Sequence, residues 1–148
     1  ESYDTTTQSI AATNTFQDVN FNTNVVLREI THPSAAIFTF SATGIYEVSL
    51  TYGWNAAGGA PNAGESILVK NTVAVPGTYT EVPGTQIYHE VSTNNLKQAI
   101  CGVFTFLVNS GESIKMRIEA DNTNNQLQAV TNVAATATSA RISIKRIA

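Results

Sequence analysis

The clearest pattern in the chain is the alternation of apolar and polar side chains. Along Ile45–Trp54 every second residue is large and apolar, which is the spacing of a strand with one buried face. Residues 114–118 and 140–147 show the same alternation over shorter lengths, and residues 36–40, just before the long segment, predict a further strand. The three alternating segments predict strands that each turn one face to a core.

Residues 99–108 follow a different pattern, because they form a nearly continuous apolar run. Such a run predicts a strand covered on both faces. The lone cysteine, Cys101, lies within it, so no intrachain disulfide can form and a small buried thiol is expected.

Two short turn sequences join these strands in pairs. Ser41–Gly44 links 36–40 to the long alternating segment, and Gly44 is expected to supply the positive φ of a tight turn. Asn109–Glu112 links the apolar run to 114–118 in the same way. The sequence therefore predicts two β-hairpins.

Weaker strand signals and turn residues fill the rest of the chain. Strands are expected at 9–12, 16–21, 25–30, 67–70, 86–91 and 126–133. Turns are expected at 58–61 and at the repeated Val-Pro-Gly-Thr of 75–78 and 82–85, where Pro-Gly suits a type II turn. No segment shows a capped 3.6-residue apolar period. The prediction is one all-β domain over residues 1–148, a sandwich of about eight to ten antiparallel strands, with residues 1–8 as a candidate extended arm.

The charge content argues against a nucleic-acid partner, and the lengths of the apolar runs argue against insertion in a membrane. Charged residues make up 13% of the chain, about half the usual ~25%, and the net charge is -3 with a pI near 5.2. A nucleic-acid-binding protein needs a basic stripe, and none is present. No apolar run approaches the ~20 residues of a membrane span, so no membrane insertion is expected.

The sequence offers no recognisable catalytic constellation. The two histidines are His32, in an expected loop, and His89, which with Glu90 is expected to form a solvated pair at a strand edge. The Gly-x-Ser-x-Gly, His-Glu-x-x-His and phosphate-loop patterns are absent. We therefore expect no catalytic residue, no enzyme activity and no cofactor.

Calcium and glycans are the two ligands that residue types suggest. Asp121, Asn122 and Asn124 bring hard oxygen ligands to one loop, although Asn/Asp-rich turns are common without metal and the expectation is no metal site. Asp4 and Asp18 are weaker calcium candidates. A glycan could stack on Trp54, Tyr52 and Tyr79; the alternative is that Trp54 ends a buried strand.

A series of motifs in order resembles the globular heads of the complement and tumour-necrosis-factor superfamily. The motifs are Phe16–Asn22, Phe38–Phe40, Gly44–Leu50, Leu107–Ile114 and Ser139–Ile144. The resemblance implies a ten-stranded TNF-like jelly roll that assembles as a compact homotrimer. It also implies that some of the chain's aromatic side chains lie at subunit contacts rather than in the core.

Two microbial branches of this superfamily look nearer than the animal ones. Tyr3–Gln8 resembles a leader in phage virion proteins, whereas Val73–Thr78 and Thr138–Ala148 resemble the tips of collagen-like exosporium glycoproteins. The expected role is therefore a non-enzymatic surface head of a phage virion, as a capsid decoration or a fibre or spike tip for assembly, stabilisation or attachment. Its expected partners are itself, a capsid, fibre or stalk protein, and a surface glycan. The alternatives are the tip of a spore exosporium filament and a carbohydrate-binding adhesin.

Overall fold

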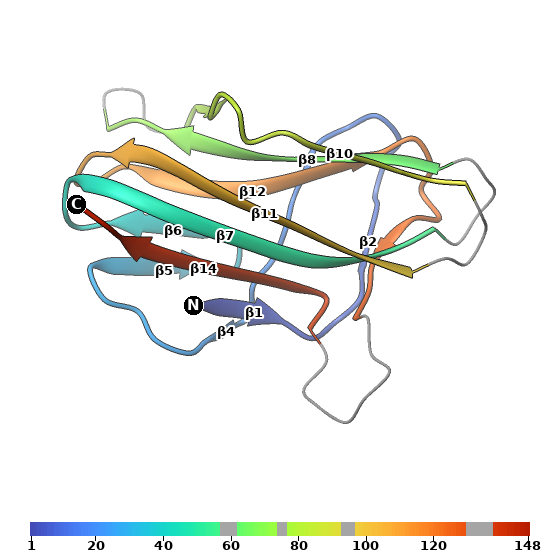
Figure 1. The fold of residues 1–148 in the computed structure, drawn as a ribbon, viewed down its shortest axis with the longest axis horizontal. Helices are drawn as coiled ribbons and strands as arrows, with labels where there is room; N and C mark the ends of the chain where they lie inside the picture. The colour runs from blue at the N-terminus through green and yellow to red at the C-terminus, as the bar shows by residue number, and fades with distance from the viewer. Residues whose placement is uncertain (57–61, 74–76, 93–96, 130–137) are drawn as a thin grey trace.

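The protein folds as two antiparallel sheets packed face to face (Figure 1), as seen in a computed structural model. The structure describes residues 1–56, 62–73, 77–92, 97–129 and 138–148. Within these residues all regular structure is strand, and no helix is long and apolar enough to cross a membrane. The expected all-β jelly-roll sandwich is confirmed.

Over the described ranges each sheet contains seven strands. The first sheet, sheet A, has the order β2-β13-β7-β14-β1-β4, with β11 on the other side of β7. Its strands are β1 (Ser2–Asp4), β2 (Gln8–Ser9), β4 (Thr23–Asn24), β7 (Gly44–Asn55), β11 (Lys97–Val108), β13 (Gln126–Leu127) and β14 (Ala140–Arg146).

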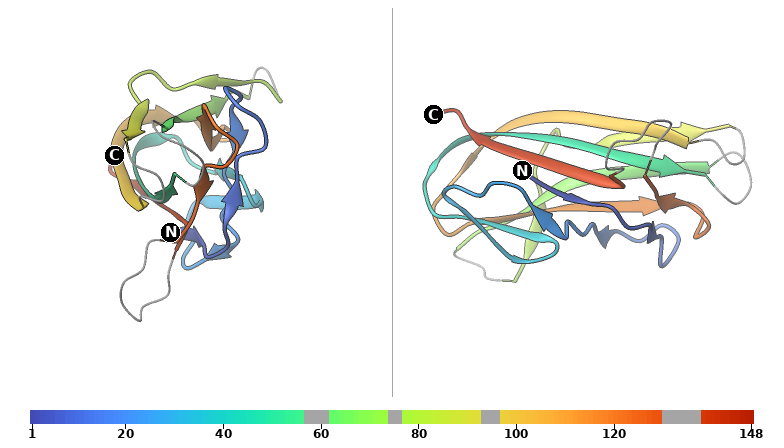
Figure 2. Two further views of the ribbon diagram at one scale, coloured as in Figure 1. Left: turned by 90° about the vertical axis from the view of Figure 1, so that its right-hand side faces the viewer. Right: turned by 90° about the horizontal axis from the view of Figure 1, so that it is seen from below.

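The second sheet, sheet B, has the order β10-β8-β12-β6-β5, with β3 beside β12 and β9 beside β8. Its strands are β3 (Gln17–Asp18), β5 (Ile30–Ser34), β6 (Ile37–Phe40), β8 (Asn62–Asn71), β9 (Tyr79–Glu81), β10 (Ile87–Val91) and β12 (Ser113–Ala120). The sandwich therefore has two sides, one where β11 and β10 are the outer strands and one where β4 and β5 are (Figure 2).

The two predicted hairpins are wrong, because in both cases the chain crosses from one sheet to the other. β6 pairs with β5 and β12 in sheet B, whereas β7 pairs with β11, β13 and β14 in sheet A. β11 and β12 are divided in the same way. The two crossing turns meet, since Ser110 donates its backbone N–H to Thr43 Oγ1 (3.0 Å) and its hydroxyl to Ser41 O (2.9 Å).

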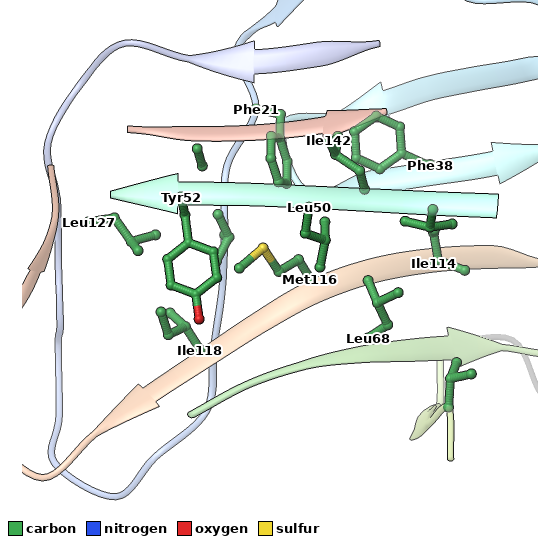
Figure 3. Packing of buried hydrophobic residues seen from close by; sticks show 14 of the residues in the cluster. Phe21, Phe38, Leu50, Tyr52, Leu68, Ile114, Met116, Ile118, Leu127 and Ile142 are labelled. Atoms are coloured by element: carbon green, nitrogen blue, oxygen red, sulfur yellow. The ribbon is translucent and has the colours of Figure 1, made fainter. Parts of the chain in front are cut away.

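The core lies between the sheets and is filled by the buried faces of the alternating strands. Figure 3 shows Leu50 of sheet A beside Met116 of sheet B, and Ile142 of sheet A beside Phe38 of sheet B. The largest fully buried side chains include Trp54, Tyr46, Tyr52, Phe21, Phe38 and Phe40. Burying each such side chain stabilises the fold by roughly 1.5–3 kcal/mol, so this layer supplies the main favourable term.

The glycines confirm two of the expected turns but not the reason for Gly44. Gly84 and Gly111 adopt positive φ (78° and 85°), as the turns at 82–85 and 109–112 require. Gly77 also has a positive φ of 87°, but residues 75 and 76 of the turn expected at 75–78 lie outside the described residues. Gly44 is not among the positive-φ residues; instead, a Cβ there would collide with Arg146 and with the carbonyl of Ala148. Gly44 is therefore required for close approach of the C-terminal strand.

Residues 1–8 are built into sheet A rather than extended from it. β1 pairs with β14 and β4, and the backbone N–H of Ser139 donates to Asp4 O (2.8 Å). The buried carboxylate of Asp4 accepts from Thr6 Oγ1 (2.7 Å), Gln8 Nε2 (2.9 Å) and Asn22 Nδ2 (2.9 Å). The motif Tyr3–Gln8 thus specifies a hydrogen-bonded anchor of the N-terminal segment.

Several weaker strands differ from their expected lengths. Most of the expected strand at 25–30 is a connecting segment, because Glu29 has a positive φ of 56° and β5 begins only at Ile30. The strands at 67–70 and 86–91 are present, the first longer than expected, whereas those at 9–12, 16–21 and 126–133 shorten to two-residue pairings within their described parts. The turn at 58–61 and residues 130–133 lie outside the described residues.

Candidate functional site

The most distinctive surface is the side of the sandwich formed by β11 and β10. Among the described residues, β11 forms ladder hydrogen bonds only with β7, in register over its whole length. Residues 98–108 contain no charged side chain. A long, uncharged edge strand is an association site unless something covers it, because its free N–H and C=O groups can pair with another strand.

The outward face of β11 carries apolar side chains into solvent. Val103 is 64% exposed and Leu107 55%, and Leu107 lies directly across from Ile45, which is 40% exposed. Cys101 is exposed on the same face. The sequence predictions of a strand covered on both faces and of a buried thiol are therefore wrong, because β11 is an edge strand that packs only its inward face.

The inward face of β11 lies at a narrow opening between the two sheets. Ile100, Phe104 and Phe106 pack against the core and are only partly buried. Gly102 allows sheet B to approach, since a Cβ there would lie 2.6 Å from Ile87 Cδ1 of β10. We name the exposed surface of Cys101, Val103 and Leu107 the apolar edge. Tyr88 of β10, 63% exposed, lies on the outer face of sheet B with Glu65 and Glu119.

The same face of sheet A becomes polar away from the apolar edge. Glu47 of β7 lies across from Lys145 of β14, and Arg141 of β14 lies across from Tyr3 of β1. The Arg141 guanidinium also pairs with the Glu1 carboxylate, with Nη2 to Oε2 at 2.8 Å. One side of the sandwich is therefore apolar and the adjacent face polar.

Two of the three predicted glycan contacts are in the core. Trp54 and Tyr52 are 0% and 1% exposed, because both point inward from β7. Neither ring is available to stack on a sugar in this structure, so these two predictions are corrected. Tyr79 is partly exposed, and the Lys115 ammonium lies 4.4 Å from its ring centroid. Its role as a glycan contact stays a prediction.

His89 is buried rather than solvated, contrary to expectation. Its ring packs edge-on against Trp54, with centroids 4.4 Å apart, and its Nδ1 lies 3.4 Å from the Tyr52 hydroxyl. The hydroxyl itself donates to Ser66 Oγ at 2.9 Å. Burial lowers the pKa of His89 to about 4. Glu90 points to the opposite face, so no acid–base pair forms.

His32 has a different neighbourhood, on β5 rather than in a loop. Its Nδ1 lies 2.8 Å from Asn24 Oδ1, and its ring stacks on Phe38 with centroids 4.3 Å apart. Burial also lowers the pKa of His32, although a hydrogen bond with the backbone at Ala35 acts against that shift. The two histidines thus lie on different strands with different partners.

The acidic residues named as calcium candidates have structural partners. Asp121 Oδ2 accepts the Ala63 N–H (3.0 Å), and Asn122 Oδ1 accepts the Asn124 N–H (2.9 Å) in an Asx turn. Over the described residues there is no group of three or more His, Cys, Asp or Glu that could hold a metal ion. The calcium loop stays an untested alternative.

Asp18 joins two cations on the outer face of sheet B. Its carboxylate accepts from Lys115 Nζ (2.6 Å) and Arg117 Nε (2.8 Å). Burial by itself would raise the pKa of Asp18, but these two hydrogen bonds hold it below its usual range. Asp18 therefore fixes the short strand β3 against β12.

Strand order, crossing connections and packed faces define a TNF-like jelly roll. The crystal structure of murine APRIL at pH 5.0 has the same fold, with a TM-score of 0.58 at 10% identity, covering 95% of this chain and 96% of that one. Eiger TNF from S. frugiperda gives 0.53 at 10% identity, covering 80% and 69%. At this identity the likeness concerns the fold. No protein-family model matches the sequence, and no curated protein matches it.

Proposed function

We propose that this chain is the non-enzymatic head of a homotrimer displayed on a surface. The observation that carries the proposal is the apolar edge, where an uncharged edge strand exposes Val103 and Leu107 to solvent. A protein with so few charged residues gains most by covering this edge with a second copy. The polar face of sheet A is a different surface, so contact between edge and face is heterologous and closes into a ring after three copies rotate by 120°.

A phage virion is the setting that we favour for this head, as a capsid decoration or as the tip of a fibre or spike. The support is the leader-like motif Tyr3–Gln8, in which Asp4 organises the N-terminal segment within the fold. The rival setting is the tip of a spore exosporium filament. The parent chain separates them, since Gly-x-y repeats before Glu1 favour the spore, whereas a coiled coil or capsid-binding arm favours the virion.

A carbohydrate-binding adhesin is less well supported, because Trp54 and Tyr52 are buried. Tyr79 is the remaining aromatic candidate. Binding on a glycan array that is lost in Tyr79→Ala would move the proposal towards attachment, and an array without binding leaves display and assembly as the role.

Size-exclusion chromatography with light scattering tests the trimer. The wild type should elute at about three times 15.8 kDa at micromolar concentration. Val103→Lys should give a folded monomer, because it buries a lysine charge in the apolar edge. Val25→Lys is the matched control, since Val25 is 56% exposed but follows β4 at the opposite side of the sandwich. A monomeric wild type, or a trimer that survives Val103→Lys unchanged, would show that the apolar edge does not assemble the protein.

A further inference from the structure

The opposite side of the sandwich, where β4 and β5 are the outer strands, contains a cavity of about 410 Å³. Residues 25–29 connect these two strands and cover the opening between the sheets. Figure 1 shows this segment in blue at the lower left, beside β1. The volume lies in the range of small-molecule sites, about 300–1,000 Å³.

The floor of the cavity is an outward extension of the hydrophobic core. Phe38 of β6 and Ile142 of β14 line it and are fully buried, and Ile144 of β14 adds a partly buried wall. Leu27 and Ile30 line it from the covering segment and the start of β5. These apolar walls favour a hydrocarbon or aromatic group over water.

The rim of the cavity has an excess of positive charge. Its lining includes three cations (Arg28, Lys145 and Arg146) and two carboxylates (Glu1 and Glu29). Both carboxylates already have arginine partners, Glu1 with Arg141 at 2.8 Å and Glu29 with Arg146 at 3.5 Å. Arg28 and Lys145 have no hydrogen-bond or ion-pair partner among the described residues. The free charge at the mouth is therefore positive.

The covering segment is held in place by its backbone. Val25 N–H donates to Glu1 O (2.9 Å), and Ser41 N–H donates to Glu29 O (2.9 Å). Glu29 adopts a positive φ of 56°, a conformation that a non-glycine residue keeps only where its surroundings enforce it. The cavity is thus formed before any ligand arrives, which lowers the entropic cost of binding.

We propose that this cavity binds a free, single-chain amphiphile with an anionic head, such as a medium-chain carboxylate. The chain lies against Leu27, Ile30 and Ile144, the partly accessible apolar side chains of the lining, and the head group lies at Arg28. The cavity and the apolar edge are on opposite sides of the sandwich, but the cavity rim shares Glu1 and Lys145 with the polar face of sheet A, so the titrations are made on monomeric Val103→Lys as well as on the wild type.

Isothermal titration calorimetry with decanoate, below its micelle concentration, tests the site. Saturable one-to-one binding per chain is expected, with decanol weaker and decyltrimethylammonium weaker still. Arg28→Glu should weaken decanoate roughly fivefold or more and leave decanol unchanged, because it reverses a charge at the rim. Absence of decanoate binding, or equal binding of all three probes, overturns the proposal.

Leu27→Trp tests the cavity itself by filling it from the covering segment. It should abolish binding of decanoate and decanol, whereas Val25→Trp, on the same segment but outside the lining, should bind both normally. Circular dichroism checks that the variants fold. If Leu27→Trp does not fold, the test is the Arg28→Glu titration alone: weaker binding of decanoate with unchanged binding of decanol supports the proposal, and any other result contradicts it. Unchanged binding in folded Leu27→Trp places the ligand elsewhere and contradicts the proposal.

Discussion

His89 is a buried base whose proton affinity differs between the folded and the unfolded chain. It lies between Trp54, Tyr52 and the backbone of Gly64, where a Cβ would lie 2.6 Å from its Nε2. Within the described part of the chain His89 forms no ion pair with a carboxylate, and its Nε2 has no hydrogen-bond partner. Protonating the ring in the folded state would bury an uncompensated charge.

This environment predicts that stability falls as pH falls. The pKa of His89 is lowered to about 4 in the folded state, against 6.5 for an ordinary histidine. Above pH 6.5 the ring is neutral in both states; between 6.5 and 4 the unfolded chain binds a proton that the folded chain does not, at a cost of up to about 3 kcal/mol. His32 acts in the same direction.

Urea unfolding at fixed protein concentration, between about pH 7.5 and pH 5, measures this loss. The carboxylates with lowered pKa values, Asp18 and Glu112, stay ionised in this window. Burial raises the pKa of Glu119, which acts in the opposite direction to the histidines, so the contribution of His89 is read from the difference in slope between the wild type and His89→Gln. The free energy of unfolding of His89→Gln should depend less on pH than that of the wild type, whatever the absolute stability of the variant. Equal slopes in the two proteins would show that His89 does not titrate as its burial requires.

At the residue scale the sequence predicts which side chains are apolar but not all of their directions. Trp54 and Tyr52 could be placed by alternation, and the alternative that Trp54 ends a buried strand is the one observed. The burial of His89 could not be predicted by alternation, because it depends on Gly64 of a neighbouring strand, which leaves space for the ring. Pairings between distant segments decide such cases, and a local pattern does not contain them.

β11 shows what an apolar run leaves open. The run at 99–108 correctly predicts a strand, but a continuous apolar strand is compatible with burial by the same chain or by another one. Here β7 covers one edge of β11 and the core covers one face; Val103 and Leu107 stay exposed. An edge strand that faces only water normally carries charged side chains, and residues 98–108 carry none. This lack of charge was the feature of the sequence that could have indicated a strand covered by another chain.

The thiol of Cys101 reports whether β11 is covered in solution. It is exposed in the single chain, on the outward face of the apolar edge. In a trimer closed by that edge, an aromatic disulfide reagent should react with it at least about tenfold more slowly than in a monomeric variant. Leu107→Lys is the suitable monomer, because its new charge lies six residues along the strand, about 20 Å from the sulfur.

The urea-unfolded chain supplies the reference rate for the free thiol. If light scattering shows that the wild type is a trimer and Leu107→Lys a monomer, equal rates of Cys101 modification in the two proteins would mean that the trimer forms without covering β11.

The local sequence also could not predict that the two crossing turns connect different sheets. A short polar turn containing glycine between two strands predicts a hairpin, yet 41–43 and 109–112 both carry the chain between sheets. They do so because Ser110 satisfies its hydrogen bonds on the other turn, at Thr43 and Ser41. A jelly roll needs such pairs of connections, and the ordered motif series anticipated that fold where the turn chemistry did not.

For the whole molecule, assembly should make stability depend on concentration. If folded chains are trimers and unfolded chains are monomers, mass action favours the folded state as protein is added. Raising the concentration about a hundredfold should raise the unfolding midpoint by about 5 °C in the wild type, and not at all in Val103→Lys. Midpoints measured by circular dichroism at both concentrations test this. A wild-type midpoint that does not move would contradict an obligate trimer.

The fold of the whole chain was more predictable than its surfaces. Alternation, turn residues and the motif order were sufficient for a TNF-like jelly roll, because the core repeats a simple rule on every strand. The apolar edge and the cavity beneath residues 25–29 depend on which strands end each sheet, and that order is set by contacts between segments far apart in the chain.

The position of β14 has a consequence for synthesis on the ribosome. β14 lies between β7 and β1 in sheet A, and among the strands that the structure describes β1 pairs otherwise only with β4, over two residues. A nascent chain that has reached residue 139 therefore holds an N-terminal strand without its main partner and a β7 with one edge open from Tyr46 to Tyr52. β1 must wait for β14, so sheet A closes only after residues 140–146 have been translated.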